Sequence, residues 1–204
     1  MLQIHNIKDL SHPALRPYLE IRKDENQHGR GVFVAEGEKI TRRLLESPLE
    51  VASLLLPDNM LDILGPLAEQ RAEEIHVFVA PKKHLELMTG TSSFQGVTSV
   101  GRIPSKKTEA ETIESVPPHR LFLAVDEIIG TENMGVIARN AAAFRADALV
   151  VGETCCSPWL RKAVRASLGA VFQIETLESD NLPKTLEQLR KCGMKIVAKH
   201  GQAS

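Results

Sequence analysis

Short runs of branched aliphatic residues alternate with longer amphipathic stretches along most of the chain. The apolar runs predict buried strands, and apolar residues at helical spacing predict helices. The predicted strands are Gly31–Ala35, Val51–Leu56, Ile75–Ala80, Gly96–Gly101, Leu121–Glu127, Ala148–Gly152, Val171–Leu177 and Lys195–Ala198. The predicted helices are Glu36–Leu45, Met60–Arg71, Lys82–Met88, Met134–Arg145, Trp159–Leu168 and Pro183–Lys191. Strands and helices that alternate with short loops indicate an α/β fold, with parallel sheets covered by helices on both faces.

A change of composition interrupts this alternation in the middle of the chain. From Arg102 to Pro118 the sequence is polar and charged, contains three prolines and has almost no large apolar residue. Such a segment buries little surface and makes few contacts, as linkers between domains do. The pattern therefore predicts a domain at residues 1–101, a linker at 102–118 and a second domain at 119–204.

The composition narrows the class of protein. Of the 204 residues, 43% are hydrophobic and 25% are charged, which is typical of a folded globular protein. No apolar run is long enough to cross a membrane, and the first residues lack the order of a signal peptide, so we expect a cytoplasmic protein. The three cysteines form no Cys-x-x-Cys pair and the seven histidines have no ligand spacing, so neither a disulfide framework nor a metal site is predicted.

The segment Gly130–Arg139 directly follows a predicted strand and leads into a predicted helix. A glycine-containing turn at the carboxyl end of a strand is where open α/β sheets bind ligands. Gly130 and Gly135 have the spacing of a phosphate-binding loop, but Val136 occupies the place of the required lysine, and the dinucleotide fingerprint G-x-G-x-x-G is absent. The alternative is purely structural, with Asn133 as the helix cap and Gly135 allowing close packing.

The helix predicted at Met134–Arg145 has two faces of different character. At helical spacing the larger apolar residues share one face, which we expect to lie on the sheet: Ile137, Ala141 and Phe144. The opposite face is small and almost uncharged: Gly135, Ala138, Arg139 and Ala142. Because solvated faces are normally more polar, we expect a partner subunit or a substrate to pack there. The alternative for Arg139 is an ordinary solvated or ion-paired side chain.

The helix predicted at Trp159–Leu168 concentrates positive charge on one side. Its apolar stripe is formed by Leu160, Ala163, Val164 and Leu168, with Ser167 beside it. Its other face carries Arg161, Lys162 and Arg165. Between residues 139 and 165, five basic residues stand against two acidic ones, although the net charge of the chain is −1. Positive charge gathered on one face fits a surface that binds phosphates, and the alternative is ordinary solvated surface.

Two motifs in the second half resemble those of the SpoU (TrmH-type) RNA 2′-O-ribose methyltransferases of the SPOUT superfamily. The first is Asn133-x-Gly135-x-x-x-Arg139 after a strand that ends in Asp126, and the second is Arg165-x-Ser167-x-Gly169-Ala170. In the first half, Phe33-x-x-Glu36-Gly37 and the segment Thr89–Val97 resemble the start and the end of the family's substrate-binding domain. The likeness covers the chain from about residue 15 onward.

The resemblance implies a fold and an activity. The implied fold is an N-terminal ribosomal-protein-like α/β domain that binds substrate, followed by a C-terminal, mostly parallel α/β domain of the SPOUT trefoil-knot type. The implied reaction transfers a methyl group from S-adenosyl-L-methionine to a ribose 2′-hydroxyl of rRNA or tRNA, without a metal. The implied assembly is a homodimer formed through the C-terminal domain.

The motif residues take on roles through the same resemblance. Arg139 would favour the alkoxide that develops on the ribose 2′-oxygen, and Asn133 would orient the loop and the substrate. Gly135 and Gly169 would shape their turns. The residues expected to bind RNA are Arg161, Lys162, Arg165 and Ser167.

Two departures from the family pattern bear on activity. The Asp-Pro pair that usually precedes the asparagine is replaced within Gly130–Glu132. The family's Gly-x-Glu and Ser-Leu-Asn segments, which tie the knot and bind the methyl donor, are not found before Ser204, so we expect an incomplete C-terminal domain that binds the donor poorly. Three interpretations remain open: an RNA 2′-O-methyltransferase, a catalytically silent relative that only binds RNA, and an unrelated α/β nucleotide-binding enzyme.

Overall fold

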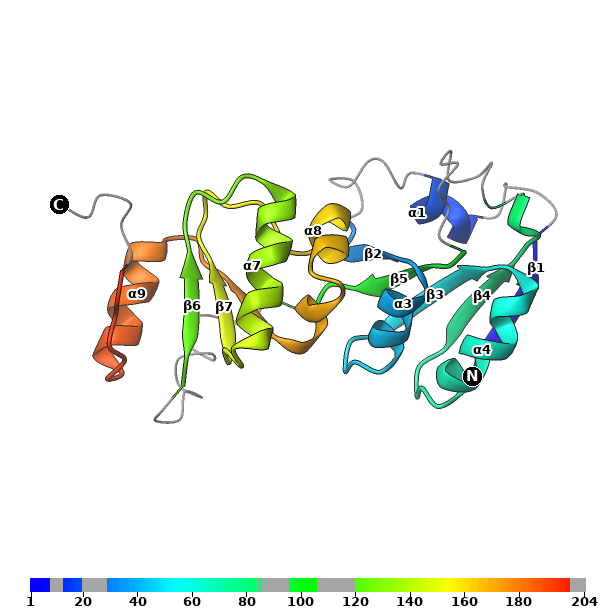
Figure 1. Ribbon diagram of the computed structural model, residues 1–204, viewed down its shortest axis with the longest axis horizontal. Helices are drawn as coiled ribbons and strands as arrows, with labels where there is room; N and C mark the ends of the chain where they lie inside the picture. The colour runs from blue at the N-terminus through cyan, green and yellow to red at the C-terminus, as the bar shows by residue number, and fades with distance from the viewer. Residues whose placement is uncertain (8–12, 20–28, 84, 86–95, 106–119, 199–204) are drawn as a thin grey trace.

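The computed structural model describes residues 1–7, 13–19, 29–83, 85, 96–105 and 120–198 of the chain. Two sheets lie side by side along the long axis of the molecule, one built from the first half of the chain and one from the second (Figure 1). None of the helices in these residues has the length and apolar character needed to span a bilayer.

The first sheet has five strands, in the order β1 (Leu2–Asn6), β4 (Ile75–Val79), β3 (Val51–Leu56), β5 (Thr98–Arg102) and β2 (Val32–Glu36). β1, β4 and β3 are parallel, whereas β5 is antiparallel to both of its neighbours. The prediction of a parallel sheet therefore holds for β1, β4 and β3 and is wrong for β5, because a strand buried on both faces has the same apolar pattern in either direction. The hydrophobic pattern also fails to predict β1, an edge strand without a fully buried residue.

Helices cover both faces of this first sheet, as predicted. On one face lie α3 (Glu38–Leu45) and α4 (Asp58–Glu69), which contribute to a large buried cluster. On the other face lie the short η1 (Pro13–Leu15) and α1 (Arg16–Leu19), which contribute to a second cluster.

The second sheet has three strands in the order β6 (Phe122–Val125), β7 (Ala148–Val151) and β8 (Glu175–Glu178). All three are parallel, which confirms the prediction for this half. The helices of this unit are α7 (Thr131–Ala143), α8 (Arg161–Ala166), the 3₁₀ turn η2 (Ala170–Gln173) and α9 (Leu182–Lys191).

The helices of the second unit pack on both faces of its sheet. Leu149 and Val151 of β7 lie in the cluster that contains the buried residues of α7 and α8. Val150, between them, points to the other face and packs with Leu182 and Leu189 of α9. Because successive side chains of a strand point to opposite faces, α9 lies across the sheet from α7 and α8.

Two predicted strands of the second half differ from the structure. The first three residues of the strand predicted at Val171–Leu177 belong to the 3₁₀ turn η2, and the extended strand begins at Glu175. The segment Lys195–Ala198 is not a strand. Its apolar pattern is compatible with one, but a strand also needs a hydrogen-bonded neighbour, and this segment pairs with none of the described strands.

The packed face of α7 also differs from the prediction. Phe144 is the C-cap residue beyond the last helical turn and is 79% exposed. The buried residues are Met134, Gly135, Ala138 and Ala141. A Cβ placed on Gly135 would overlap the carbonyl oxygen of Ala163 and would lie 2.7 Å from the Cβ of Ala166. Gly135 on the small face of α7 therefore packs on α8 of the same chain, so the prediction of a partner subunit or a substrate is wrong at this residue, whereas Arg139 on that face is exposed.

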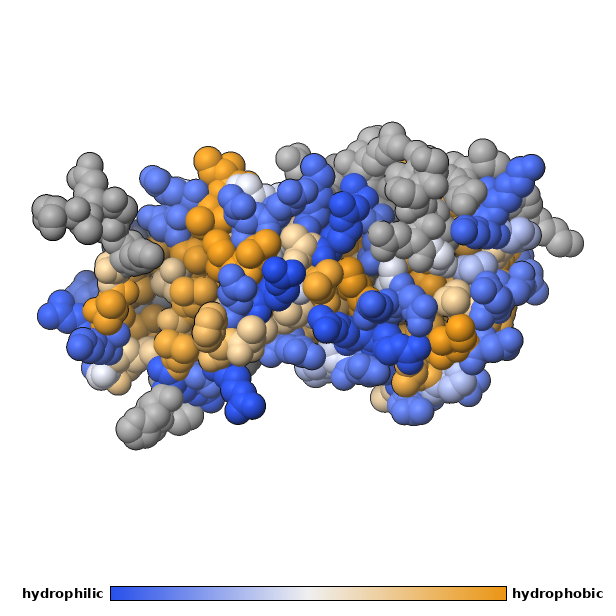
Figure 2. Space-filling model, in the orientation of Figure 1, coloured by the Kyte–Doolittle hydropathy of each residue, from blue (hydrophilic) through white to orange (hydrophobic). Residues whose placement is uncertain are grey.

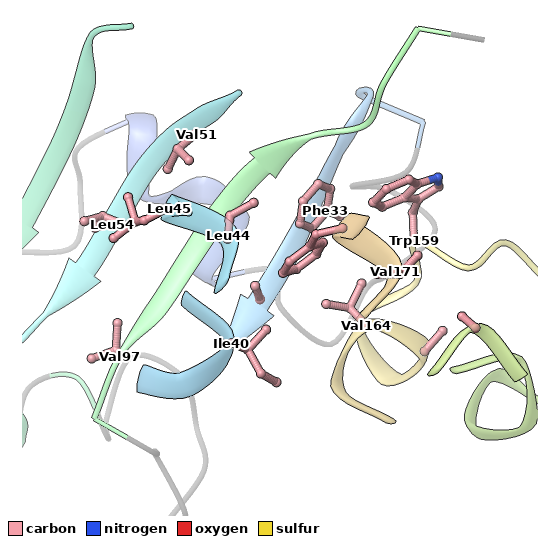
Figure 3. Close-up of a cluster of buried hydrophobic side chains, with 14 of the residues drawn as sticks. Phe33, Ile40, Leu44, Leu45, Val51, Leu54, Val97, Trp159, Val164 and Val171 are labelled. Carbon is pink, nitrogen blue, oxygen red and sulfur yellow. The ribbon is translucent and has the colours of Figure 1, made fainter. Parts of the chain in front are cut away.

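Aromatic side chains join the two sheet units. The centroid of the Phe33 ring on β2 lies 5.1 Å from that of the Trp159 ring (Figure 3). It lies 5.3 Å from the centroid of the Phe172 ring. Opposite Phe33 in the sheet is Gly101, where a Cβ would collide with the ring. The buried cluster therefore continues from the α3 and α4 side of the first sheet to the α7 and α8 side of the second.

Some predictions fall wholly or partly outside the described residues: the helix at Lys82–Met88, the segment Thr89–Val97 and the linker at 102–118. β5 ends at Arg102 and β6 begins at Phe122, so each half of the chain forms its own sheet. The division into domains at 1–101 and 119–204 stays a prediction, because the buried cluster spans both halves.

The contact between α7 and α8 predicts a large effect for a small substitution. We expect Gly135→Ala to lower the free energy of unfolding by about 1–3 kcal/mol, since the added methyl group must push the two helices apart. Gly65→Ala in α4 is the control, because outside its chain neighbours its Cβ would meet only Leu61 Cδ1, at 3.8 Å. Alanine is the better helix former by about 1 kcal/mol, but Pro66 follows and crowds a Cβ at this position, so we expect a smaller change in stability than for Gly135→Ala. Chemical denaturation measures both variants, and equal unfolding free energies would contradict the close contact.

Candidate functional site

The carboxyl ends of β6 and β7 are tied together by one carboxylate. Asp126 follows β6, and its Oδ1 accepts hydrogen bonds from the Glu127 backbone N–H at 2.9 Å and from the Thr154 hydroxyl at 2.8 Å. Glu127 adopts a left-handed conformation with φ of 53°. These bonds fix the turn that leads into α7 against the loop that follows β7.

The two adjacent cysteines belong to this loop and are half-buried. Cys155 Sγ lies 3.4 Å from the Ile128 backbone N–H, and the Cys156 N–H donates to the Ile128 carbonyl at 2.8 Å. Burial, with a smaller contribution from the neighbouring Cys155, raises the pKa of the Cys156 thiol above its ordinary value. A thiol with a raised pKa is a weak nucleophile at neutral pH, so Cys156 serves the packing of the loop.

Asn133 and Arg139 both lie on α7 and both are exposed. The helix begins at Thr131 with Gly130 as its N-cap, so the interpretation of Asn133 as the cap is wrong. A Cβ on Gly130 would lie only 3.2 Å from Asn133 Nδ2, so the asparagine side chain folds back toward the start of the helix. Arg139 is six residues further on, about 9 Å along the axis and on a different face. The structure therefore does not bring these two side chains together.

Arg139 borders the contact between α7 and α8. It follows Gly135 by four residues, which places it one turn further along the same side of the helix. Its guanidinium has no hydrogen bond or ion pair with any described residue. A cation with this exposure can approach a bound polyanion without first breaking an internal ion pair.

The basic residues of α8 divide between two roles. Lys162 and Arg165 are exposed. Arg161 instead forms an ion pair with Glu36 at the end of β2, with its Nη1 3.0 Å from both carboxylate oxygens. These two side chains are only 17% and 18% exposed. The prediction that all three cations share an open face is therefore wrong for Arg161, whose charge is neutralised at the junction of the sheets.

Ser167 and Gly169 shape the turn that follows α8. The Ser167 hydroxyl is buried, donates to the Val164 carbonyl at 2.8 Å and accepts from the Gly169 backbone N–H at 3.1 Å. Gly169 has a φ of 78°, which glycine adopts without strain. Ser167 therefore supports the turn from inside and is not open to solvent, unlike Lys162 and Arg165.

Leu168, between these two residues, is exposed. The prediction that it belongs to the apolar stripe of α8 is therefore wrong. Leu168 has a φ of 55° and is 49% exposed. Its carbonyl accepts a hydrogen bond of 2.6 Å from Nη1 of Arg43 on α3. The sequence does not identify Arg43 as a site residue, because the two partners are 125 positions apart and no local pattern indicates their contact.

The sequence of this chain is similar to those of known RNA methyltransferases. Residues 120–204 match the SpoU rRNA Methylase family. The chain is 27% identical over 210 residues to an uncharacterized tRNA/rRNA methyltransferase of Mycobacterium tuberculosis, an alignment that covers 99% of this chain and 70% of that protein. It is 22% identical over 196 residues to the 23S rRNA (guanosine(2553)-2′-O)-methyltransferase of Bacillus subtilis, covering 96% and 72%.

A solved structure shares the fold. The AdoMet-bound rRNA methyltransferase from Sinorhizobium meliloti superimposes with a TM-score of 0.75 over 93% of this chain and 69% of that one, at 19% sequence identity. The arrangement of two α/β units side by side is therefore common to both proteins.

The ion pair between Arg161 and Glu36 can be tested with a double-mutant cycle. Arg161→Met and Glu36→Gln each leave one largely buried charge without its partner, so we expect each to cost about 2–3 kcal/mol and the double variant to cost less than their sum. The control is the pair of Arg102 and Glu50, which is just as short at 2.7 Å but about half exposed. We expect a coupling energy below about 1 kcal/mol there. Equal coupling energies in the two pairs would contradict the expectation that burial at the junction strengthens the pair of Arg161 and Glu36.

Proposed function

We propose that this protein, whose residues 120–204 match the SpoU rRNA Methylase family, transfers a methyl group from S-adenosylmethionine to a ribose 2′-hydroxyl of rRNA or tRNA. The observation that carries the proposal is the family match over the unit that presents Arg139 and Asn133 on α7. The rRNA methyltransferases among the relatives and the AdoMet-bound neighbour support the substrate class and the methyl donor.

The groove beside β6 lacks the groups that would hold the methyl donor. The donor carries a sulfonium cation and ribose hydroxyls, both of which favour carboxylate or carbonyl partners. The groove beside β6 has a volume of about 670 Å³ and is lined mostly by apolar residues together with Arg120 and Lys195, without a carboxylate. This groove therefore does not fit the methyl donor, because it offers cations and apolar side chains where the sulfonium would need a carboxylate.

Arg139 is proposed to act on the nucleophile. A ribose hydroxyl is a poor nucleophile at neutral pH, and negative charge develops on its oxygen as it attacks a methyl group. A cation beside that oxygen stabilises the developing charge more than it stabilises the neutral hydroxyl. The role of arginine is electrostatic, because the guanidinium has no acceptor atom for a proton. As the ribose O–C bond forms, the S–C bond of the donor breaks, the sulfur keeps that electron pair, and the hydroxyl proton passes to solvent water.

Asn133 and the two exposed cations of α8 are proposed to contact other parts of the RNA than Arg139 does. The Asn133 carboxamide, at the carboxyl end of the second sheet, is suited to hydrogen-bond a ribose or base edge. Lys162 and Arg165 are suited to bind phosphates, which position the RNA without reading its sequence. Arg161 and Ser167 are proposed to support this surface from within, because both are engaged in internal contacts.

A homodimer through the second unit is also proposed. The outer side of α7 and the turn before it expose large apolar residues: Ile129, Val136 and Phe144. Two more exposed leucines lie in and next to the edge strand β6: Leu123 and Leu121. In Figure 2 hydrophobic surface gathers over α7 and β6 on the face toward the viewer. Exposed apolar surface of this kind is typical of a subunit interface, and a second copy of the chain would cover it.

Methyl transfer from labelled S-adenosylmethionine to RNA tests the activity. We expect Arg139→Ala to lower the rate about 10²–10³-fold, in the range of other single electrostatic donors, and to lower RNA affinity much less. Arg139→Lys keeps the charge and is expected to retain part of the rate. Arg190→Ala on α9 is the control, since it removes an exposed arginine on the other face of the sheet. Full turnover by Arg139→Ala would remove Arg139 from the mechanism, and RNA binding without any turnover in the wild type would favour a catalytically silent relative.

The proposed dimer is tested by sedimentation at micromolar protein concentrations. We expect Phe144→Asp to weaken self-association at least tenfold, because it puts a charge into the apolar contact. The matched control is Ile63→Asp on α4, an equally simple change at another exposed apolar residue of the first unit. A wild-type protein that sediments as a monomer, or a dimer indifferent to Phe144→Asp, would contradict this interface.

A further inference from the structure

The turn after α8 combines strained backbone with an exposed apolar side chain. Leu168 has a φ of 55°, which costs a branched residue free energy that glycine or asparagine would not lose. Its neighbours Ser167 and Gly169 are buried, whereas the leucine side chain is 49% exposed. Strain of this kind persists where surrounding contacts enforce it, and it is concentrated at ligand-binding sites.

Contacts from both sheet units enforce this conformation. From within the second unit, Ser167 Oγ bonds to backbone on either side of the leucine. From the first unit, Arg43 Nη1 donates to the Leu168 carbonyl at 2.6 Å. Ile40 of α3 also packs against the turn, within 3.4 Å of where a Cβ on Gly169 would lie. The turn is therefore built at the seam between α8 and α3.

Cations from both units surround the turn. The exposed ones are Lys39 and Arg43 on α3, and Lys162 and Arg165 on α8. None of them has an ion pair with a described residue. The nearby carboxylates of Glu36 and Glu38 are already paired, with Arg161 and Arg42 respectively. The middle of the face in Figure 2 accordingly carries strongly hydrophilic surface around a hydrophobic spot.

We infer that Leu168 and these four cations, hereafter the seam surface, bind an unpaired segment of the RNA across both units. This inference rests on the proposed function for its substrate. The cations would contact consecutive phosphates, and the leucine would pack against the apolar face of an unstacked base. An unpaired segment fits better than a duplex, because the bases of an A-form helix are stacked inside and cannot reach a protruding aliphatic side chain.

The first arm of the test separates the apolar contact from a structural role. Leu168→Asn removes the apolar side chain and suits the left-handed backbone, so we expect an unchanged or higher unfolding midpoint. Affinity for a labelled stem–loop RNA is expected to fall about fivefold to tenfold, with an unchanged dependence on salt. Affinity for a duplex of the same number of nucleotides is expected to stay the same. Unchanged stem–loop affinity, or an equal loss for the duplex, would overturn the inference.

The second arm tests whether the surface crosses the seam. Each lost phosphate contact lowers the slope of log affinity against log salt by about 0.7–0.9. We expect this change for Lys39→Ala in the first unit as well as for Lys162→Ala in the second. Lys184→Ala on α9, across the sheet from α8, is the control and should leave the slope unchanged. A slope unaffected by Lys39→Ala would confine the surface to the second unit and overturn the inference.

These measurements need no methyl donor, so their outcome is independent of turnover. Variants that lose stem–loop affinity in a protein that methylates no RNA would support the seam surface and refute the proposed activity. Variants that bind the stem–loop like the wild type, in a protein that methylates RNA, would overturn the seam surface and support the proposed activity. A wild type that binds neither the stem–loop nor the duplex would overturn both the seam surface and the proposed activity.

Discussion

The position of the basic helix α8 relative to the first sheet depends on the contact of Phe33 with Trp159 and Phe172. Trp159 precedes α8 and Phe172 follows its turn, so both ends of the segment that carries Lys162 and Arg165 are held against one ring of β2. Such aromatic pairs contribute about 0.5–1.5 kcal/mol each beyond the area they bury. The ring has room because Gly101 lies opposite it. A glycine in the first sheet therefore helps to position a basic helix of the second.

The ion pair beside this aromatic contact adds specificity more than free energy. Removing two charges from water costs about as much as their attraction returns, so the apolar cluster supplies most of the stability of the junction. The pair of Arg161 and Glu36 satisfies its charges in one relative orientation of α8 and β2. An arginine that looks available for RNA in the sequence is thereby engaged in holding the surface from which its neighbours Lys162 and Arg165 project.

The hydrophobic pattern predicts elements better than it predicts what they pack against. The boundaries of β3 agree with the predicted Val51–Leu56, and the parallel order of the second sheet agrees as well. The direction of β5, the packed face of α7 and the pairing of Arg161 could not be predicted. Each depends on which distant element lies alongside, whereas periodicity reports only which positions are apolar. Phe144 is the clearest example, because its apolar character predicts burial but its place beyond the helix end leaves it exposed.

The close approach of α7 to α8 links the two halves of the proposed site. Gly135 allows that approach, Arg139 follows it by one turn of α7, and Lys162 and Arg165 project from the helix that Gly135 touches. The proposed catalytic cation and the phosphate-binding cations therefore keep a separation set by backbone packing and not by flexible side chains. Because Arg43 and Ile40 fix the turn after α8 to the first unit, that separation extends to Lys39. An RNA segment bound across the seam would thus be aligned toward Arg139 by packing contacts within the protein itself.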